Sequence, residues 1–438
     1  MKPKTSLILF WALFFWFLIF QPDRGVAQET KVYTLQESIA EALANNWSLR
    51  AKQEKLDQAT SVKNQARADF LPKLSTTYGY TRLGADRKIR YLQDLTIGTR
   101  DNYWWQGTVT QPLFTGFALL STYRLAQLGI DQSKMEIELE KLDLALNVKQ
   151  TYFEILAADK ALEAFEKAEE ALASHVKVAR SFYEVGMIPI NDLLESEVEL
   201  GNAQHDVIRA LNATQLSRST FNTVLSRPVN AKVEVEDILV HEPEGGSFQE
   251  YLQKALKGRP EMRLIEINIL QGDQRIRLAR SKNYPEVVLT FDYMKEGDTL
   301  DVSGSDVHEA DEWQAGAALS WTFWEWGKTY YAVKEQESLK KELIKTRMAL
   351  EDQIQLQIKD GVLGLEEAEK NIPITQKAVE QGEENLRVSE ERYKAQVSTS
   401  TEVLDAQRYL TTARVNNFNA YYNYHLAKAR LLWAMGEF

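Results

Sequence analysis

The stretch of sequence that decides the fold is residues 285–328, PEVVLTFDYMKEGDTLDVSGSDVHEADEWQAGAALSWTFWEWGK. On either side of an acidic loop at 297–311, two runs of about ten residues alternate between two kinds of side chain. One kind is apolar or aromatic and the other is small or polar, which predicts a hairpin of two strands with one apolar face. About ten residues is also the length of a β-strand that crosses a bilayer.

The same pattern occurs earlier in the chain because the sequence is duplicated. Residues 34–72 match residues 247–285 at a constant shift of 213, and further along the shift is 210. A duplication with a length change in one surface loop explains both shifts. It divides the chain into a first repeat at 28–228 with a β-hairpin at 72–114, a linker with a short strand at 229–246, and a second repeat at 247–438 with a β-hairpin at 285–324.

One helix is predicted before each hairpin, and a very long helix followed by a return helix is predicted after it. The segment 116–185 contains no proline or turn cluster, and its apolar residues recur at helical spacing, which predicts one helix of about 70 residues. At 1.5 Å per residue this helix is about 100 Å long, which favours a coiled-coil hairpin over a globular core. The second repeat has an equivalent helix at 327–395, in which Pro373 predicts a kink, and return helices are predicted at 192–226 and 402–435.

The first 27 residues have the pattern of a signal peptide. Lys2 and Lys4 precede an apolar run at 7–20, and small residues follow at 25–27. The run has about 14 residues, whereas a transmembrane helix needs about 20, so we expect cleavage of 1–27. An uncleaved N-terminal anchor is the alternative. No later stretch is apolar for long enough to form a transmembrane helix, so the mature chain is predicted to stay soluble in the envelope or to enter a membrane as strands.

Composition and motifs exclude several classes of function. The chain has 438 residues, of which 44% are apolar, and its net charge of −11 argues against nucleic acid as a partner. It has no cysteine, and none of its five histidines has the spacing of a metal site. Because nucleophile elbows, phosphate-binding loops and dinucleotide loops are also lacking, we expect no catalytic residues, no metal and no cofactor, and no enzyme activity. The acidic loop at 297–311 is interpreted as a hydrated loop rather than a cation site.

The number of strands indicates an oligomer. One chain supplies four strands, whereas a closed barrel needs at least about eight. Two chains would give a barrel of about eight strands filled by side chains, and three would give about twelve strands with room for an aqueous lumen. We therefore predict a mainly α-helical homotrimer with a transmembrane β-barrel of 12 strands, continued by a long coiled-coil tunnel. A soluble β-sandwich is the alternative, although its edges would be open.

These motifs resemble those of the TolC family of outer-membrane efflux proteins over essentially the whole mature chain. The resemblance rests on the proline before each first strand, the strand-to-helix turns and the helix tips, namely FLPKL (70–74), QPLFTG (111–116), YEVGMIPINDLLESE (183–197), NYPEV (283–287), FWEWGK (323–328) and YKAQVSTSTEVLDAQ (393–407). It implies a trimeric barrel in the cell outer membrane, surrounded by lipid, and a helical tunnel that spans the periplasm. It also implies docking to an inner-membrane pump through a periplasmic adaptor, a membrane fusion protein. The expected function is a passive, gated exit duct of a tripartite efflux or type I secretion system, and a structural scaffold without a channel is the alternative.

Acidic side chains at the helix tips are the candidate gate. Glu402 and Asp405 are three residues apart on one helix face, so three chains would place them in a ring that favours cations. Solvated acids near a helix start are the alternative, because the helix dipole favours negative charge there. The first-repeat counterparts are Asp192 and Glu195. The resemblance places Glu402 and Asp405 on the family's constriction acids, and Asp192 and Tyr393 on its closing network.

The resemblance also marks the adaptor contacts and two departures. Adaptor tips are expected at Gly186, Met187, Val397 and Ser398. Ser398 stands where the family's best-known gate has an arginine, and Gln396 replaces a tip glycine, so this gate is expected to be held differently or more loosely.

Tryptophans near the strand ends are predicted to form an aromatic girdle at the membrane interface. They are Trp104, Trp105, Trp313, Trp321 and Trp324.

Overall fold

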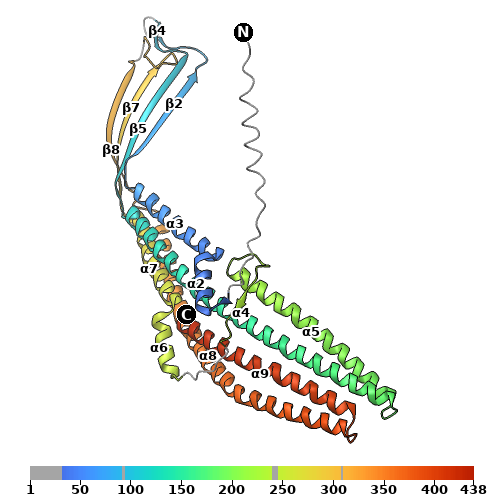
Figure 1. Ribbon diagram of the computed structural model, residues 1–438. Coiled ribbons are helices and arrows are strands. Elements are labelled where there is room, and N and C mark those ends of the chain that lie inside the picture. The colour runs from blue at the N-terminus through green and yellow to red at the C-terminus, as the bar shows by residue number, and fades with distance from the viewer. Residues whose placement is uncertain (1–31, 91–93, 239–244, 307–308) are drawn as a thin grey trace, which may run out of the picture.

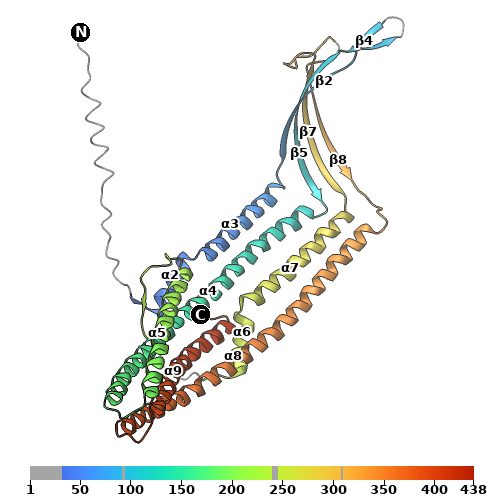
Figure 2. The same cartoon turned by 90° about the vertical axis from the view of Figure 1, so that its right-hand side faces the viewer.

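The computed structural model describes residues 32–90, 94–238, 245–306 and 309–438, so the predicted signal peptide, residues 1–27, lies outside the described residues. The described chain is elongated. A β-sheet lies at one end, and helices run from it to two hairpin tips at the other end (Figure 1). The view turned by 90° shows the same arrangement, with the strands continuing into the helices (Figure 2).

Two helices precede the strands in each repeat, where the sequence analysis predicts one. They are α2 (Leu35–Asn45) and α3 (Trp47–Ala68) in the first repeat, and α6 (Phe248–Gly258) and α7 (Pro260–Arg280) in the second. The break at Asn46 arises because its backbone is extended and its side chain accepts hydrogen bonds from the amides of Ser48 and Leu49. Arg259 is extended in the same way, and Pro260 then begins α7, where a proline needs no amide hydrogen.

The first helix of each repeat begins with the same capping motif. Thr34 and Glu37 form a capping box before α2, and Ser247 and Glu250 form one before α6. These pairs are related by the shift of 213 residues that the sequence shows. The two repeats therefore agree in structure down to the hydrogen bonds at their first helix ends.

The four long strands form one antiparallel sheet. They are β2 (Lys73–Arg82), β5 (Asp101–Thr115), β7 (Glu286–Gly297) and β8 (Asp311–Ser320), in the order β2-β5-β7-β8. The hairpins of the two repeats lie side by side through β5 and β7, which leaves β2 and β8 as edges. A second small hairpin that the sequence pattern did not predict, β3 (Arg87–Arg90) and β4 (Asp94–Gly98), comes between β2 and β5 in the chain and forms a separate two-stranded sheet.

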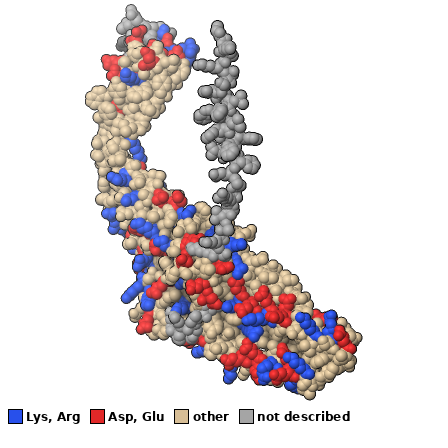
Figure 3. Space-filling view, in the orientation of Figure 1, with Lys and Arg blue, Asp and Glu red and all other residues tan. Residues whose placement is uncertain are grey.

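The sheet has one apolar face and one polar face, as the alternation predicts. On the apolar face Tyr78 pairs with Trp105, and Tyr293 pairs with Trp313. The polar face carries Asp292, whose carboxylate accepts hydrogen bonds from three neighbouring side chains, Gln106, Thr108 and Gln314. Figure 3 shows a surface almost without charge over the strands, between charged regions at the outer tip and on the helices.

Each repeat then continues into one very long helix and a return helix. The long helices are α4 (Ala118–Glu184) and α8 (Lys328–Lys394), each of 67 residues, and the return helices are α5 (Ile190–Val224) and α9 (Ser400–Met435). The bounds of all four lie within two residues of those read from the sequence. Pro373 lies inside α8, which continues through it.

The core is divided between the two helical hairpins. In the first repeat it centres on the fully buried Tyr152 of α4, whose hydroxyl contacts the carbonyl oxygens of Tyr33 and Glu236 at 3.0 and 2.8 Å. These contacts hold a small parallel sheet, β1 (Val32–Tyr33) and β6 (Glu234–Val235), against the helices. In the second repeat the core centres on the buried Ile354, Ile358 and Tyr424.

Candidate gate at the helical tips

The two helical hairpins turn back at equivalent positions, Gly186 and Gln396. Both residues have positive φ, +76° and 60°. In each turn the next amide, of Met187 or Val397, bonds to a carbonyl five residues earlier, which is the Schellman arrangement for ending a helix. Glutamine at 396 thus adopts the left-handed conformation that glycine takes in the first repeat, and the tip keeps its geometry without the glycine.

The acids of the tips are already engaged within one chain. Glu402 accepts a hydrogen bond from Ser398 Oγ at 2.7 Å and lies 3.4 Å from the guanidinium of Arg392. Asp405 pairs with Arg408 at 2.7 Å. Glu402 and Asp405 lie one turn apart on α9, and about half of each side chain is exposed.

Arg392 was not identified from the sequence. It lies on α8, four residues before the turn, whereas the resemblance directs attention to the residue after the turn, Ser398. Ser398 and Arg392 bind the same carboxylate, that of Glu402. An arginine four residues before the turn was the signal available in the sequence, but only the fold shows which acid this arginine contacts.

The structure brings Tyr393 and Asp192 into one neighbourhood. Tyr393 is 3% exposed, and its ring lies 4.8 Å from the ring of His175 and 5.6 Å from that of Phe182. Burial raises the pKa of Tyr393, and the nearby charge of Asp192 raises it further. Glu195 lies on the same helix as Asp192 and accepts a hydrogen bond at 3.1 Å from Thr401 of the other hairpin.

A buried polar contact joins the two hairpins just behind the tips. His175 Nε2 of α4 lies 2.7 Å from Ser400 Oγ of α9, and Ser400 Oγ lies 2.8 Å from Ser196 Oγ of α5. Ser196 and Ser400 are fully buried, and His175 is 8% exposed. None of the three was singled out from the sequence, because their repeat counterparts are not histidine or serine and only the packing of one repeat on the other brings them together.

The outermost side chains of the tips are apolar and exposed. Met187 and Val397, predicted as adaptor contacts, are 52% and 65% exposed, and Gly186 has open space around it. Val185 and Ile190 add to this surface. An exposed apolar patch of this kind is typical of a site that another protein covers.

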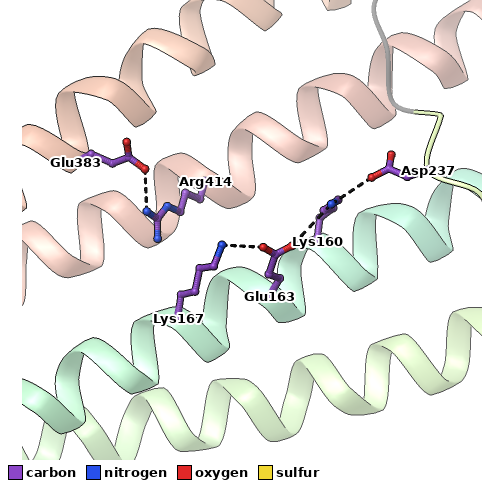
Figure 4. Close-up of polar contacts among 6 residues, drawn as sticks. All are labelled: Lys160, Glu163, Lys167, Asp237, Glu383 and Arg414. Carbon is purple, nitrogen blue, oxygen red and sulfur yellow. Dashed lines mark hydrogen bonds and ion pairs between the residues drawn. The ribbon is translucent and has the colours of Figure 1, made fainter.

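Further back, ion pairs lie along the helices and, in one case, between two of them. On α4, Glu163 pairs with both Lys160 and Lys167, and Lys160 also reaches Asp237 (Figure 4). Arg414 of α9 binds Glu383 of α8 at 2.8 Å. The tip ends of two helices carry acids: Glu402 and Asp405 on α9, and Asp192 and Glu195 on α5.

Trp104 lies apart from the other four tryptophans that are predicted to form the girdle. Trp313, Trp321 and Trp324 are exposed, and the ring of Trp105 contacts Tyr293 on the apolar face. Trp104 is the next residue along the strand and therefore points to the opposite face. Its ring packs over Gly79, where a Cβ atom would lie 2.3 Å from it, on the same face as Asp292.

The acidic loop and the helices give two further results. Within the described part of the loop, Gly297 and Gly304 pair through their backbones, and no group of acids and histidines among the described residues has metal-site geometry. None of the described helices is both apolar enough and long enough to cross a bilayer.

Comparison with known proteins agrees with this architecture. The family model for outer membrane efflux proteins matches residues 38–226 and 251–437, which are the two repeats. The outer membrane protein TolC of Vibrio cholerae is 22% identical over 412 residues, covering 92% of this chain and 90% of that protein. Nodulation protein T of Rhizobium leguminosarum bv. trifolii is 20% identical, covering 91% of this chain and 83% of that protein.

Solved structures show the same fold. The CmeC outer membrane channel of Campylobacter jejuni superposes with a TM-score of 0.80 at 18% identity, over 92% of this chain and 85% of that one. The open state of the MtrE outer membrane channel of Neisseria gonorrhoeae gives a TM-score of 0.74 at 19% identity, over 92% and 89%. Duplicated sequence, sheet and paired long helices all match, and the chain therefore belongs to the outer membrane efflux protein family and is a protein of the outer membrane that extends into the periplasm.

Proposed function

We propose that this chain forms a passive trimeric exit duct that is closed at its periplasmic tips and opened by partner proteins. The observation that carries the proposal is the four-stranded sheet, whose apolar face is exposed and whose edge strands β2 and β8 each have one edge unpaired among the described residues. An exposed apolar face suits lipid, and open edges suit pairing with further copies. Three copies supply about twelve strands, enough for an aqueous lumen.

The helices support a duct that continues beyond the membrane. Each strand pair leads directly into a helix of 67 residues, about 100 Å long, which is enough to extend far from the bilayer. The tips carry both the acids Glu402 and Asp405 and the exposed apolar residues Met187 and Val397. In this proposal the acids line the closed mouth, and the apolar residues contact a periplasmic adaptor that couples the duct to an energy-supplying pump, in an efflux or type I secretion system.

Two measurements test this proposal. The mass of the detergent-solubilised complex should correspond to three chains, and a stable monomer would contradict the duct. In planar bilayers the purified protein should give a small, cation-selective conductance that increases when Glu402 and Asp405 are both replaced by alanine. A scaffold without a channel, the alternative favoured by the length of the helices alone, passes no current in either form.

A further inference from the structure

We propose that His175, Ser196 and Ser400 form a proton-operated latch between the two hairpins, in which neutral His175 holds the tip closed and protonated His175 releases it. The proposal rests on the duct described above and adds a means of regulating its mouth. The latch joins three helices: His175 belongs to α4, Ser196 to α5, and Ser400 is the first residue of α9. Separation of the α8–α9 hairpin from the α4–α5 hairpin at the tip must break it.

The direction of the hydrogen bonds follows from counting hydrogens. Ser196 Oγ donates its single hydrogen to the carbonyl oxygen of Asp192 at 2.8 Å. Ser400 must then donate to Ser196, and the Nε2–H of His175 must donate to Ser400. The chain of bonds is complete with a neutral imidazole, and every hydroxyl in it has both a donor and an acceptor.

A positive charge on His175 has nothing in the junction to balance it. Burial lowers the pKa of His175 to about 4, and no nearby carboxylate opposes this effect. The other elements around it present Tyr393 from α8, with its ring 4.8 Å away, and the two serine hydroxyls. The charged groups on adjacent turns are Asp192, Glu195, Arg392 and Glu402.

Three of these charged groups have polar partners at the exposed tip. Glu195 accepts from Thr401, and Arg392 pairs with Glu402. Asp192 acts on Tyr393 and supplies the carbonyl that ends the hydrogen-bond chain. The junction is therefore a neutral, buried contact behind a charged rim.

The sign of the pH effect follows from this burial. An exposed histidine has a pKa of about 6.5, so the released tip binds a proton on His175 more readily than the latched tip. The latch is fully effective above pH 6.5 and weakens as the pH falls from about 6.5 to about 4. At pH 5 the linkage favours release by about 20-fold per chain relative to pH 7.

The experiment compares His175→Asn with the wild-type protein between pH 7.5 and pH 5. Asparagine keeps an N–H donor for Ser400 and cannot take up a proton. Acid should increase the open probability of the wild-type duct in planar bilayers, and His175→Asn should remove most of this increase. The control is His205→Asn, which changes an exposed histidine on α5 and should leave the acid response intact.

Hydrogen–deuterium exchange, corrected for the intrinsic effect of pH, measures release of the tip without a measurement of current. The first turns of α9 should exchange faster at pH 5 than at pH 7.5 in the wild type and not in His175→Asn. A full acid response of both readouts in His175→Asn overturns the latch. A protein whose α9 responds to acid but which passes no current overturns the duct and leaves the latch supported.

A third variant covers the case in which His175→Asn disturbs folding. The Oγ atoms of Ser196 and Ser400 are 2.8 Å apart, so the double variant Ser196→Cys/Ser400→Cys places two sulfur atoms within reach of a disulfide. The native chain has no cysteine to interfere. Oxidation should abolish the acid response and reduction should restore tip opening, whereas an acid response that persists in the oxidised form contradicts the latch.

Discussion

Replacing Arg392 by alanine tests how the ion pair at the tip sets the charge of the proposed mouth. Arg392 and Glu402 are 3.4 Å apart, with 52% and 46% of their side chains exposed. A pair as exposed as this contributes about 0.2–1 kcal/mol. Both residues belong to the α8–α9 hairpin, so the pair moves as a unit when the two hairpins of the chain separate. Arg392→Ala should therefore lower the free energy of unfolding by only about 0.2–1 kcal/mol per chain and leave the open probability nearly unchanged.

The change in charge gives a second readout of the same variant. Without Arg392 the carboxylate of Glu402 is no longer neutralised, so the reversal potential in a potassium chloride gradient should move toward stronger cation selectivity. The change in selectivity should shrink between 0.1 M and 1 M salt, because the screening length falls from about 10 Å to about 3 Å. Both quantities come from single-channel recordings in planar bilayers.

A matched control lies on the same hairpin. Arg414 binds Glu383 at 2.8 Å, also between α8 and α9, but away from the tip (Figure 4). Arg414→Ala removes an equivalent charge and should leave selectivity unchanged. The reasoning is refuted if Arg392→Ala reduces cation selectivity, or if both variants change selectivity equally.

Three further predictions concern stability, measured by chemical denaturation in detergent. Tyr152→Phe should cost about 1 kcal/mol, because the Glu236 carbonyl oxygen, 2.8 Å from the hydroxyl, loses this donor while the Tyr33 oxygen keeps the amide of Glu236; unchanged stability would contradict this. Gly116→Ala should destabilise the protein more than Gly327→Ala: both glycines have positive φ, but only at Gly116 would a Cβ atom meet backbone, the Ser281 oxygen at 2.3 Å. Burial lowers the pKa of Lys149, and the charge of a second lysine lowers it further. Because the folded chain then binds this proton less well than the unfolded chain, the free energy of unfolding should rise as the pH rises toward 10.5. Lys149→Met should be more stable at pH 7 and lack this rise.

The secondary structure was largely predictable because it depends on local pattern. The alternation around residues 285–328 predicted both the strands and their faces, and the absence of proline from 116–185 predicted α4. Pro260 was an available signal for the break between α6 and α7, since proline is favoured at the first helical position. Alternation likewise shows that Trp104 and Trp105 cannot share a face, although both were assigned to one girdle.

The site was less predictable because it depends on contacts between repeats. Glu402 and Asp405 could be selected from their spacing and from the family resemblance, but their partners could not. Arg392 reaches Glu402 across the turn, and His175 meets Ser400 only where one hairpin packs on the other. Residues separated by 225 positions leave no periodic signal in a single sequence.

The turns that connect the sheet to α4 and to α8 differ in how much space surrounds the backbone, so the two long helices are not equally free to rotate. At Gly116 the chain is pressed against the backbone of Ser281, whereas around Gly327 only the side chain of Tyr331 comes near, at 3.4 Å from a Cβ position. Rotation of α8 therefore meets less obstruction at its root than rotation of α4. In the proposed duct, α8 is therefore the long helix with more freedom to rotate where it leaves the sheet, and α4 is the one held in place.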